Sequence, residues 1–148
     1  MIRPFEIAAV ATLALLMSTV PTFAQLEGTW QCEMTYTELT PQGQRTSGYI
    51  KQYIMGVYAG GGLEVQGSYT GIGGLTQFQV QGQWQIDQGH FMAQAQGMQQ
   101  SQWGTMPEMF VMLGLPSPDG STMSYNHEQR DASGSYVMSR QLFACRRG

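Results

Sequence analysis

The fold is decided by the stretch Phe78-Gln79-Val80-Gln81-Gly82-Gln83-Trp84-Gln85-Ile86. Every even-numbered position in it is apolar or glycine, and every odd-numbered position is glutamine. This alternation is typical of a β-strand that buries one face and exposes the other to water. Asp87-Gln88-Gly89 has turn chemistry, and a mainly apolar run from His90 to Ala95 follows it. Residues 77–96 are therefore predicted to form a β-hairpin.

Shorter alternating runs extend the pattern over the rest of the chain. Turns rich in glycine or proline are expected at 41–43, 59–62, 116–120 and 131–134. Strands are expected at 30–36, 49–55, 63–69, 123–127 and 136–145, with a short strand or helical turn at 109–113 and a long loop at 98–107. About eight strands at this spacing predict an all-β domain, a single antiparallel up-and-down barrel or, alternatively, a β-sandwich.

The first 24 residues have the organisation of a secretory signal peptide. Arg3 lies near the start, residues 7–20 are almost continuously apolar, and small residues precede a cleavage point after Ala24. The apolar run is shorter than the roughly 20 residues of a membrane-spanning helix, so cleavage is favoured over retention as an anchor. The expected product is a periplasmic or secreted protein with one mature domain, residues 25–148.

Composition limits the classes of partner. The chain is 42% hydrophobic and 11% aromatic, which supports a packed core, whereas only 11% of its residues are charged. The predicted signal peptide holds one basic and one acidic residue, so the net charge of −3 is unchanged by its removal. No basic stripe is present that would bind nucleic acid or an anionic membrane. Neither nucleic acid nor an integral membrane segment after processing is expected.

Cys32 and Cys145 lie near the two ends of the predicted mature domain. In an oxidising compartment such a pair is expected to form a disulfide, the alternative being two free thiols. The long loop that this bond would close corresponds to a stabilisation of roughly 4–5 kcal/mol in the chain-entropy model. His90 and His127 do not add ligands at zinc-site spacing, so no metal site is predicted.

The predicted mature domain begins with Leu26-Glu27-Gly28-Thr29-Trp30. A Gly-x-Trp sequence at the start of the first strand resembles the entrance motif of lipocalin-like, or calycin, β-barrels. The resemblance, which also rests on the strand count, implies that Trp30 closes one end of a barrel. It further implies that an arginine from the end of the last strand packs over the tryptophan ring.

Strand register supplies a candidate for that arginine. If Cys32 faces Cys145 on antiparallel neighbours, Trp30 lies opposite Arg147 on the same face. An indole and a guanidinium in this position can stack. The first and last strands would then be neighbours, as barrel closure requires. The alternative is that Arg146 and Arg147 form a frayed basic tail.

Catalysis is not expected from the sequence. It contains no recognisable nucleophile motif, and His90 and His127 are interpreted as outer-face strand residues without a catalytic partner. No cofactor is predicted.

Ligand binding suits the predicted fold better, because an eight-stranded barrel has room inside for packed side chains or one small ligand. The inward positions proposed to line such a pocket are Tyr36, Tyr53, Met55, Phe78 and Trp84. They combine an apolar wall with phenol groups that orient the polar end of a ligand. A solid core would show the same alternation, so both interpretations stay open.

Four methionines, Met98, Met106, Met109 and Met112, gather around Pro107. The spacing from Met106 to Met112 resembles the thioether spacing of periplasmic copper-handling proteins, and thioethers suit Cu(I). Methionine also fills irregular gaps and adaptable binding surfaces. The segment is interpreted mainly as an apolar loop that covers the barrel mouth or contacts a partner, with Cu(I) binding as a minor alternative.

The chain is therefore expected to be an exported, lipocalin-like binding protein for a small apolar ligand. The alternative is an envelope or extracellular protein–protein interaction module, or an enzyme inhibitor. A carrier should contain an interior hollow, whereas a module should be solid inside and expose an apolar patch.

Overall fold

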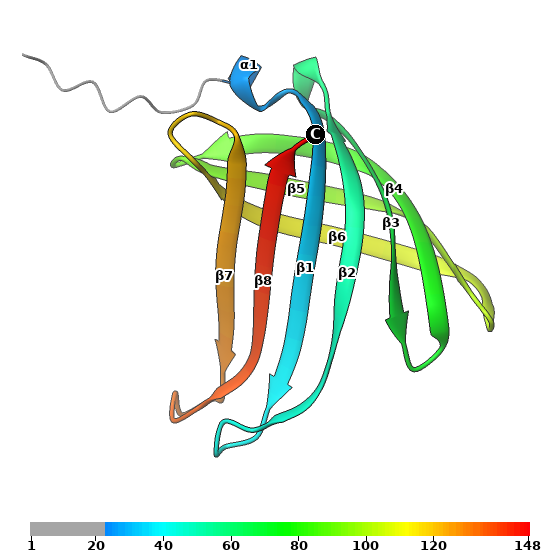
Figure 1. The fold of residues 1–148 in the computed structure, drawn as a ribbon, viewed down its shortest axis with the longest axis vertical. Coiled ribbons are helices and arrows are strands. Elements are labelled where there is room, and N and C mark those ends of the chain that lie inside the picture. Colours follow the sequence, from blue (N-terminus) through cyan, green and yellow to red (C-terminus); the bar gives the residue numbers. More distant parts are fainter. Residues whose placement is uncertain (1–22) are drawn as a thin grey trace, which may run out of the picture.

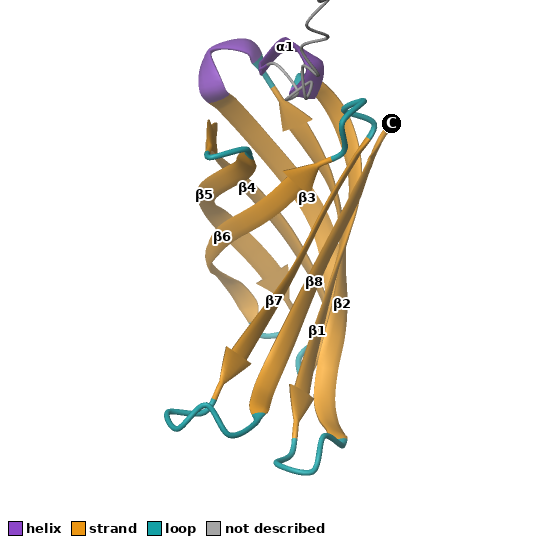
Figure 2. Ribbon diagram, turned by 90° about the vertical axis from the view of Figure 1, so that its left-hand side faces the viewer, coloured by secondary structure: helices purple, strands orange, loops and turns teal. Residues whose placement is uncertain are grey.

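The computed structural model describes residues 23–148, an all-β domain preceded by one helical turn (Figures 1 and 2). Its elements are α1 (Phe23–Leu26), β1 (Gly28–Leu39), β2 (Arg45–Val57), the 3-10 turn η1 (Ala59–Gly61), β3 (Gly62–Gly71), β4 (Gly74–Asp87), β5 (His90–Ser101), β6 (Gly104–Pro116), β7 (Thr122–Arg130) and β8 (Val137–Arg147). The predicted signal peptide lies outside the described residues up to position 22, and its expected cleavage point after Ala24 falls within α1. Among residues 23–148, no helix has the length and apolar character needed to cross a membrane.

The eight strands close into one antiparallel barrel in the order β1 to β8, which confirms the predicted barrel over the sandwich. Closure is made by β8, which pairs with β1. In that register Cys32 faces Cys145, and the two form a disulfide. Trp30 faces Arg147 as the sequence predicted, with the guanidinium carbon 4.9 Å from the indole ring centroid.

The hairpin predicted at residues 77–96 is present as part of the longer pair β4–β5. Glutamines on β4 point outward, whereas Phe78, Val80 and Trp84 are buried. Position 82 belongs to the inward row of β4, and it is a glycine because the backbone of β5 lies directly against it. A Cβ at this position would meet the backbone oxygen of Gln94 and lie 2.5 Å from the Cα of Ala95.

The prediction of a long loop at residues 98–107 is wrong. β5 continues to Ser101, β6 begins at Gly104, and only a tight turn joins them. The period-two pattern continues through this region, but its inward positions are held by Gly97 and Gln99 rather than by large apolar residues. The segment from Met109 to Leu113 is accordingly the middle of a long strand and not a separate short element.

Apolar side chains fill the end of the barrel next to α1. Trp30, Met55, Phe91 and Leu26 are fully buried there. We call these four side chains the plug. The indole N–H of Trp30 donates a hydrogen bond of 2.8 Å to the backbone oxygen of Leu26, which connects α1 to the first strand. This end is closed by packing, and any interior binding site must lie toward the opposite end.

Candidate functional site

The barrel wall is incomplete along one seam. β6 pairs with β5 from Gly104 to Gly114, but it pairs with β7 only at Leu115 and Pro116. Figure 2 shows β6 and β7 diverging from the loop that joins them. The two strands therefore leave a lateral opening into the barrel, which we call the β6–β7 window.

A hollow of about 370 Å³ lies at this window. Its lining comes from β1, β2, β6, β7 and β8 and consists of Met34, Tyr49, Lys51, Tyr53, Met109, Phe110, Val111, Leu113, His127, Gln141 and Phe143. Met34, Tyr53, Phe110 and Phe143 are buried and form an apolar floor. His127 and Gln141 supply polar groups from β7 and β8.

One side of the window is the unpaired edge of β6. Met109, Val111 and Leu113 line the hollow although they alternate with the buried Phe110 and Met112 and lie on the outer face of the strand. Pro107, Met109, Val111 and Leu113 are alternate residues of β6, so their backbone groups point to the same side of the strand. Proline is tolerated in a strand where its missing N–H faces an unpaired edge, which indicates that this side is the one facing β7. We infer that the backbone N–H and C=O groups of these three residues point into the window.

A buried ion pair crosses the interior beside the hollow. Lys51 of β2 lies 2.9 Å from Glu108 of β6, and each side chain is only 11% exposed. The lysine nitrogen also lies 4.9 Å from the ring centroid of Tyr69 and 4.7 Å from that of Phe78. The two opposite charges balance each other, and the ammonium lies against two neighbouring aromatic rings.

Tyrosines form a row across the inner face of β1, β2 and β3. The ring centroids of Tyr36 and Tyr49 are 5.2 Å apart, and those of Tyr49 and Tyr69 are 5.3 Å apart. Burial raises the pKa of Tyr49, and the neighbouring phenols and Glu108 add to the shift. Burial also raises the pKa of Tyr53, whose hydroxyl lies 3.3 Å from the sulfur of Met112. Both phenols therefore stay neutral at neutral pH.

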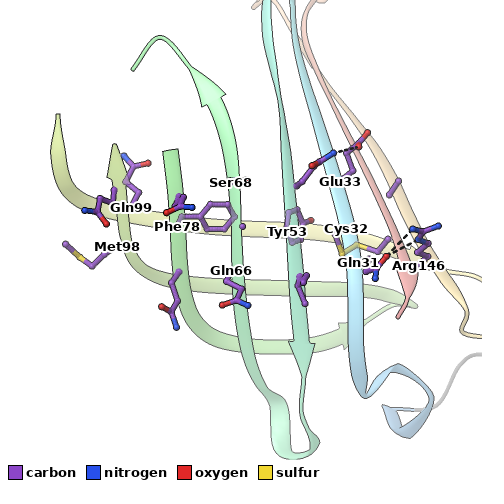
Figure 3. Close-up of a pocket in the computed structure, with 18 of the residues that line it drawn as sticks. Gln31, Cys32, Glu33, Tyr53, Gln66, Ser68, Phe78, Met98, Gln99 and Arg146 are labelled. Carbon is purple, nitrogen blue, oxygen red and sulfur yellow. Dashed lines mark hydrogen bonds between the residues drawn. A yellow bond between two sulfur atoms is a disulfide. The ribbon is translucent and has the colours of Figure 1, made fainter. Parts of the chain in front are cut away.

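A second, larger depression of about 1110 Å³ lies on the outer face of the barrel (Figure 3). It follows two neighbouring rows of outward-facing side chains, among them exposed glutamines such as Gln52, Gln66 and Gln79. Gln31 accepts hydrogen bonds from Arg146 at its rim. Because this depression is open and most of its outward-facing side chains are exposed, we regard the interior hollow as the better candidate site, although its volume is smaller.

The residues predicted to line a pocket are divided between two regions. Tyr53 lines the hollow, Phe78 packs against Tyr53 and Lys51, and the ring of Tyr36 packs at a tilt against that of Tyr49. Met55 is fully buried in the plug. Trp84 stacks on Phe91, which is also part of the plug, and donates to the backbone oxygen of Tyr58.

Sequence reasoning missed Lys51, Glu108 and Gln141, and it placed His127 on the strand exterior. His127 is indeed exposed, and the pairing of β7 with β8 sets it opposite Gln141, so that both residues line the rim of the hollow. A signal for Lys51 was present, since it lies between Tyr49 and Tyr53 in an inward-facing row. A lysine in such a row requires a buried partner of opposite charge.

The interpretation of the methionine segment as a mouth-covering loop is also wrong, because Met106, Met109 and Met112 all lie on β6. Residues three apart on a strand face opposite sides. Met112 is fully buried, whereas Met109 is 65% exposed on the outer face. The spacing that resembled a copper site therefore does not bring the three thioethers together.

Within residues 23–148, no three His, Cys, Asp or Glu side chains gather closely enough to hold a metal ion. The Cys32–Cys145 bond is compatible with an oxidising compartment. Comparison with family models and with curated proteins returned no match to this chain.

Proposed function

We propose that the protein binds one small molecule with an apolar body and a polar end in the hollow at the β6–β7 window. The observation that carries this proposal is the seam itself, where adjacent strands of a closed barrel share only two paired positions beside a hollow. A hollow of about 370 Å³ is at the lower end of the range for ligand pockets, roughly 300–1,000 Å³.

The chemistry of the lining supports binding rather than catalysis. An apolar floor favours burial of a ligand body, and a few polar groups above it fix its orientation. His127 is the one imidazole of the lining, and the lining contains no serine, threonine or free cysteine that it would activate.

Export and a lipocalin-like role belong to the same proposal. Two features support this part of the proposal: Arg147 lies over the ring of Trp30, and eight strands close into a barrel. In this proposal the mature chain begins at Gln25 and carries its ligand outside the cytoplasm. Mass analysis of the exported protein should give this start, and an intact Met1 in that material would contradict the export part alone.

The binding proposal is tested by filling the window. His127→Trp places a larger ring at the rim, whereas Asn126→Trp places the same ring on the outer face of the same strand. The readout is the fluorescence of the probe N-phenyl-1-naphthylamine, excited at a wavelength that the probe absorbs and tryptophan does not. His127→Trp should raise the probe Kd by about tenfold or more while Asn126→Trp leaves it unchanged. Absence of probe binding, or equal effects of the two variants, would overturn the proposal.

A further inference from the structure

We propose that the occupant of the β6–β7 window is an uncharged ring compound bearing a carbonyl oxygen, which accepts hydrogen bonds from Lys51 and Tyr49. This inference rests on the proposed function, because it names the ligand class of the same site. It follows from three properties of the lining: its balanced charge, its donors and its aromatic floor.

The balance of charge selects a neutral ligand. Lys51 lines the hollow, and its ammonium is already matched by Glu108 at 2.9 Å. An anionic ligand would bring a second negative charge toward Glu108, and a cationic ligand would meet the ammonium. Either would leave a poorly solvated charge without a partner of its own, which is unfavourable in a buried site. Apart from the tyrosines, the remaining ionisable side chain of the lining is His127, which is exposed at the rim.

The donors select an acceptor oxygen. An ammonium has three N–H donors, and among residues 23–148 Glu108 is the one hydrogen-bond acceptor of the Lys51 nitrogen. The rings of Tyr69 and Phe78 lie against that nitrogen without accepting conventional hydrogen bonds. Tyr49 adds a neutral phenol from the adjacent inward position of β2. A carbonyl oxygen has two lone pairs and so can accept from both groups.

The floor selects a ring. Tyr53 and Phe110 meet edge to face with centroids 5.3 Å apart and an interplanar angle of 80°. Met34 and Phe143 complete the buried apolar surface. Aromatic side chains in this arrangement offer both ring faces and ring edges to a planar guest.

Four naphthalenes of similar size test the ligand class by isothermal titration calorimetry: 2-acetonaphthone (a neutral ketone), 2-ethylnaphthalene (no acceptor), 2-naphthoate (an anion) and 2-naphthylmethylammonium (a cation). The ketone should bind about tenfold more tightly than each of the other three. If 2-ethylnaphthalene or an ionic probe binds as tightly as the ketone, the ligand class is wrong although the binding function stands. If none of the four binds, the proposed function fails together with this inference.

A pair of variants locates the donor. Tyr49→Phe should weaken ketone binding by about tenfold and leave 2-ethylnaphthalene binding unchanged. Tyr69→Phe is the matched control, because Tyr69 belongs to the same tyrosine row but does not line the hollow. Equal affinities of the wild type and Tyr49→Phe for the ketone would contradict the assigned role. The four-probe series on the wild type decides the ligand class independently of how the variants fold.

Discussion

Arg147 lies over the buried indole of Trp30 and links three parts of the closed end. Its guanidinium donates a hydrogen bond of 2.6 Å to the backbone oxygen of Glu27, before β1, and one of 3.4 Å to that of Gly120, before β7. The guanidinium carbon lies 4.9 Å from the ring centroid of Trp30. One side chain at the end of the last strand thus joins the entrance of the first strand to the loop between β6 and β7.

Replacement of this side chain should be destabilising but not fatal. Arg147→Ala should lower the free energy of unfolding by roughly 1–3 kcal/mol, since it removes a cation–π contact and two hydrogen bonds. Arg146→Ala is the control, because Arg146 is exposed and contacts Gln31 on the outer face; its effect should stay within about 0.5 kcal/mol. Urea denaturation of both variants measures the difference, and equal midpoints would contradict the closure by Arg147.

Removing one partner of the buried ion pair should destabilise the protein more than removing both. Lys51→Met alone should destabilise by about 3–5 kcal/mol, because it leaves the Glu108 carboxylate buried without its counter-charge. The double variant Lys51→Met with Glu108→Leu should recover much of this loss, since it removes both charges. Denaturation of the wild type and the two variants gives the comparison. A double variant that is less stable than the single one would contradict the description of Lys51 and Glu108 as a buried pair whose charges balance each other.

Two methionines of β6 should differ sharply. Met112→Ala should cost about 2–5 kcal/mol because Met112 is fully buried in the barrel. Met109→Ala should change stability by less than about 0.5 kcal/mol, because its side chain is on the outer face. Thermal denaturation at one pH tests the pair, and similar losses for both would mean that the alternation along β6 is misassigned.

Stability at alkaline pH should depend on Tyr53. Burial raises its pKa in the folded state above the value of about 10 for an unfolded chain. Below about pH 10 the phenol is neutral in both states, and the stability of the folded protein does not depend on its titration. As the pH rises above about 10, the unfolded state releases the phenol proton while the folded state keeps it, so the free energy of unfolding falls. Tyr53→Phe should therefore lose less stability than the wild type between neutral pH and about pH 11. Urea denaturation across this range measures it, and parallel losses would contradict the buried phenol.

The fold was largely predictable because two local features constrain it strongly. Alternation along residues 78–86 determines which face of the hairpin is buried, and Cys32 with Cys145 determines the register of the first and last strands. Strand extent was less predictable where the inward positions are small or polar, as at Gly97 and Gln99. Pro107 lies within the segment that was expected to be a loop, and a strand with an unpaired edge accommodates it.

The site was less predictable than the fold, because its features are relations between distant strands. Tyr53 was identified from its inward position, but the window exists only because β6 and β7 separate after two paired positions. Local alternation carries no information on such a separation. The ion pair of Lys51 with Glu108 likewise joins residues 57 positions apart, so the inward position of Lys51 indicates that it needs a partner but not which residue that partner is.

Amide chemical-shift mapping shows where on the barrel a ligand binds, and so it tests whether a ligand occupies the interior at the β6–β7 window. In a titration of isotope-labelled protein with 2-acetonaphthone, we predict that the largest shift changes occur at Lys51, Phe110 and Gln141, which line the hollow. Amides of Gln52, Gln66 and Gln79 should move less, because their side chains face the outer depression. Saturable shift changes confined to that outer face, or no saturable shift change at all, would contradict ligand binding inside the barrel.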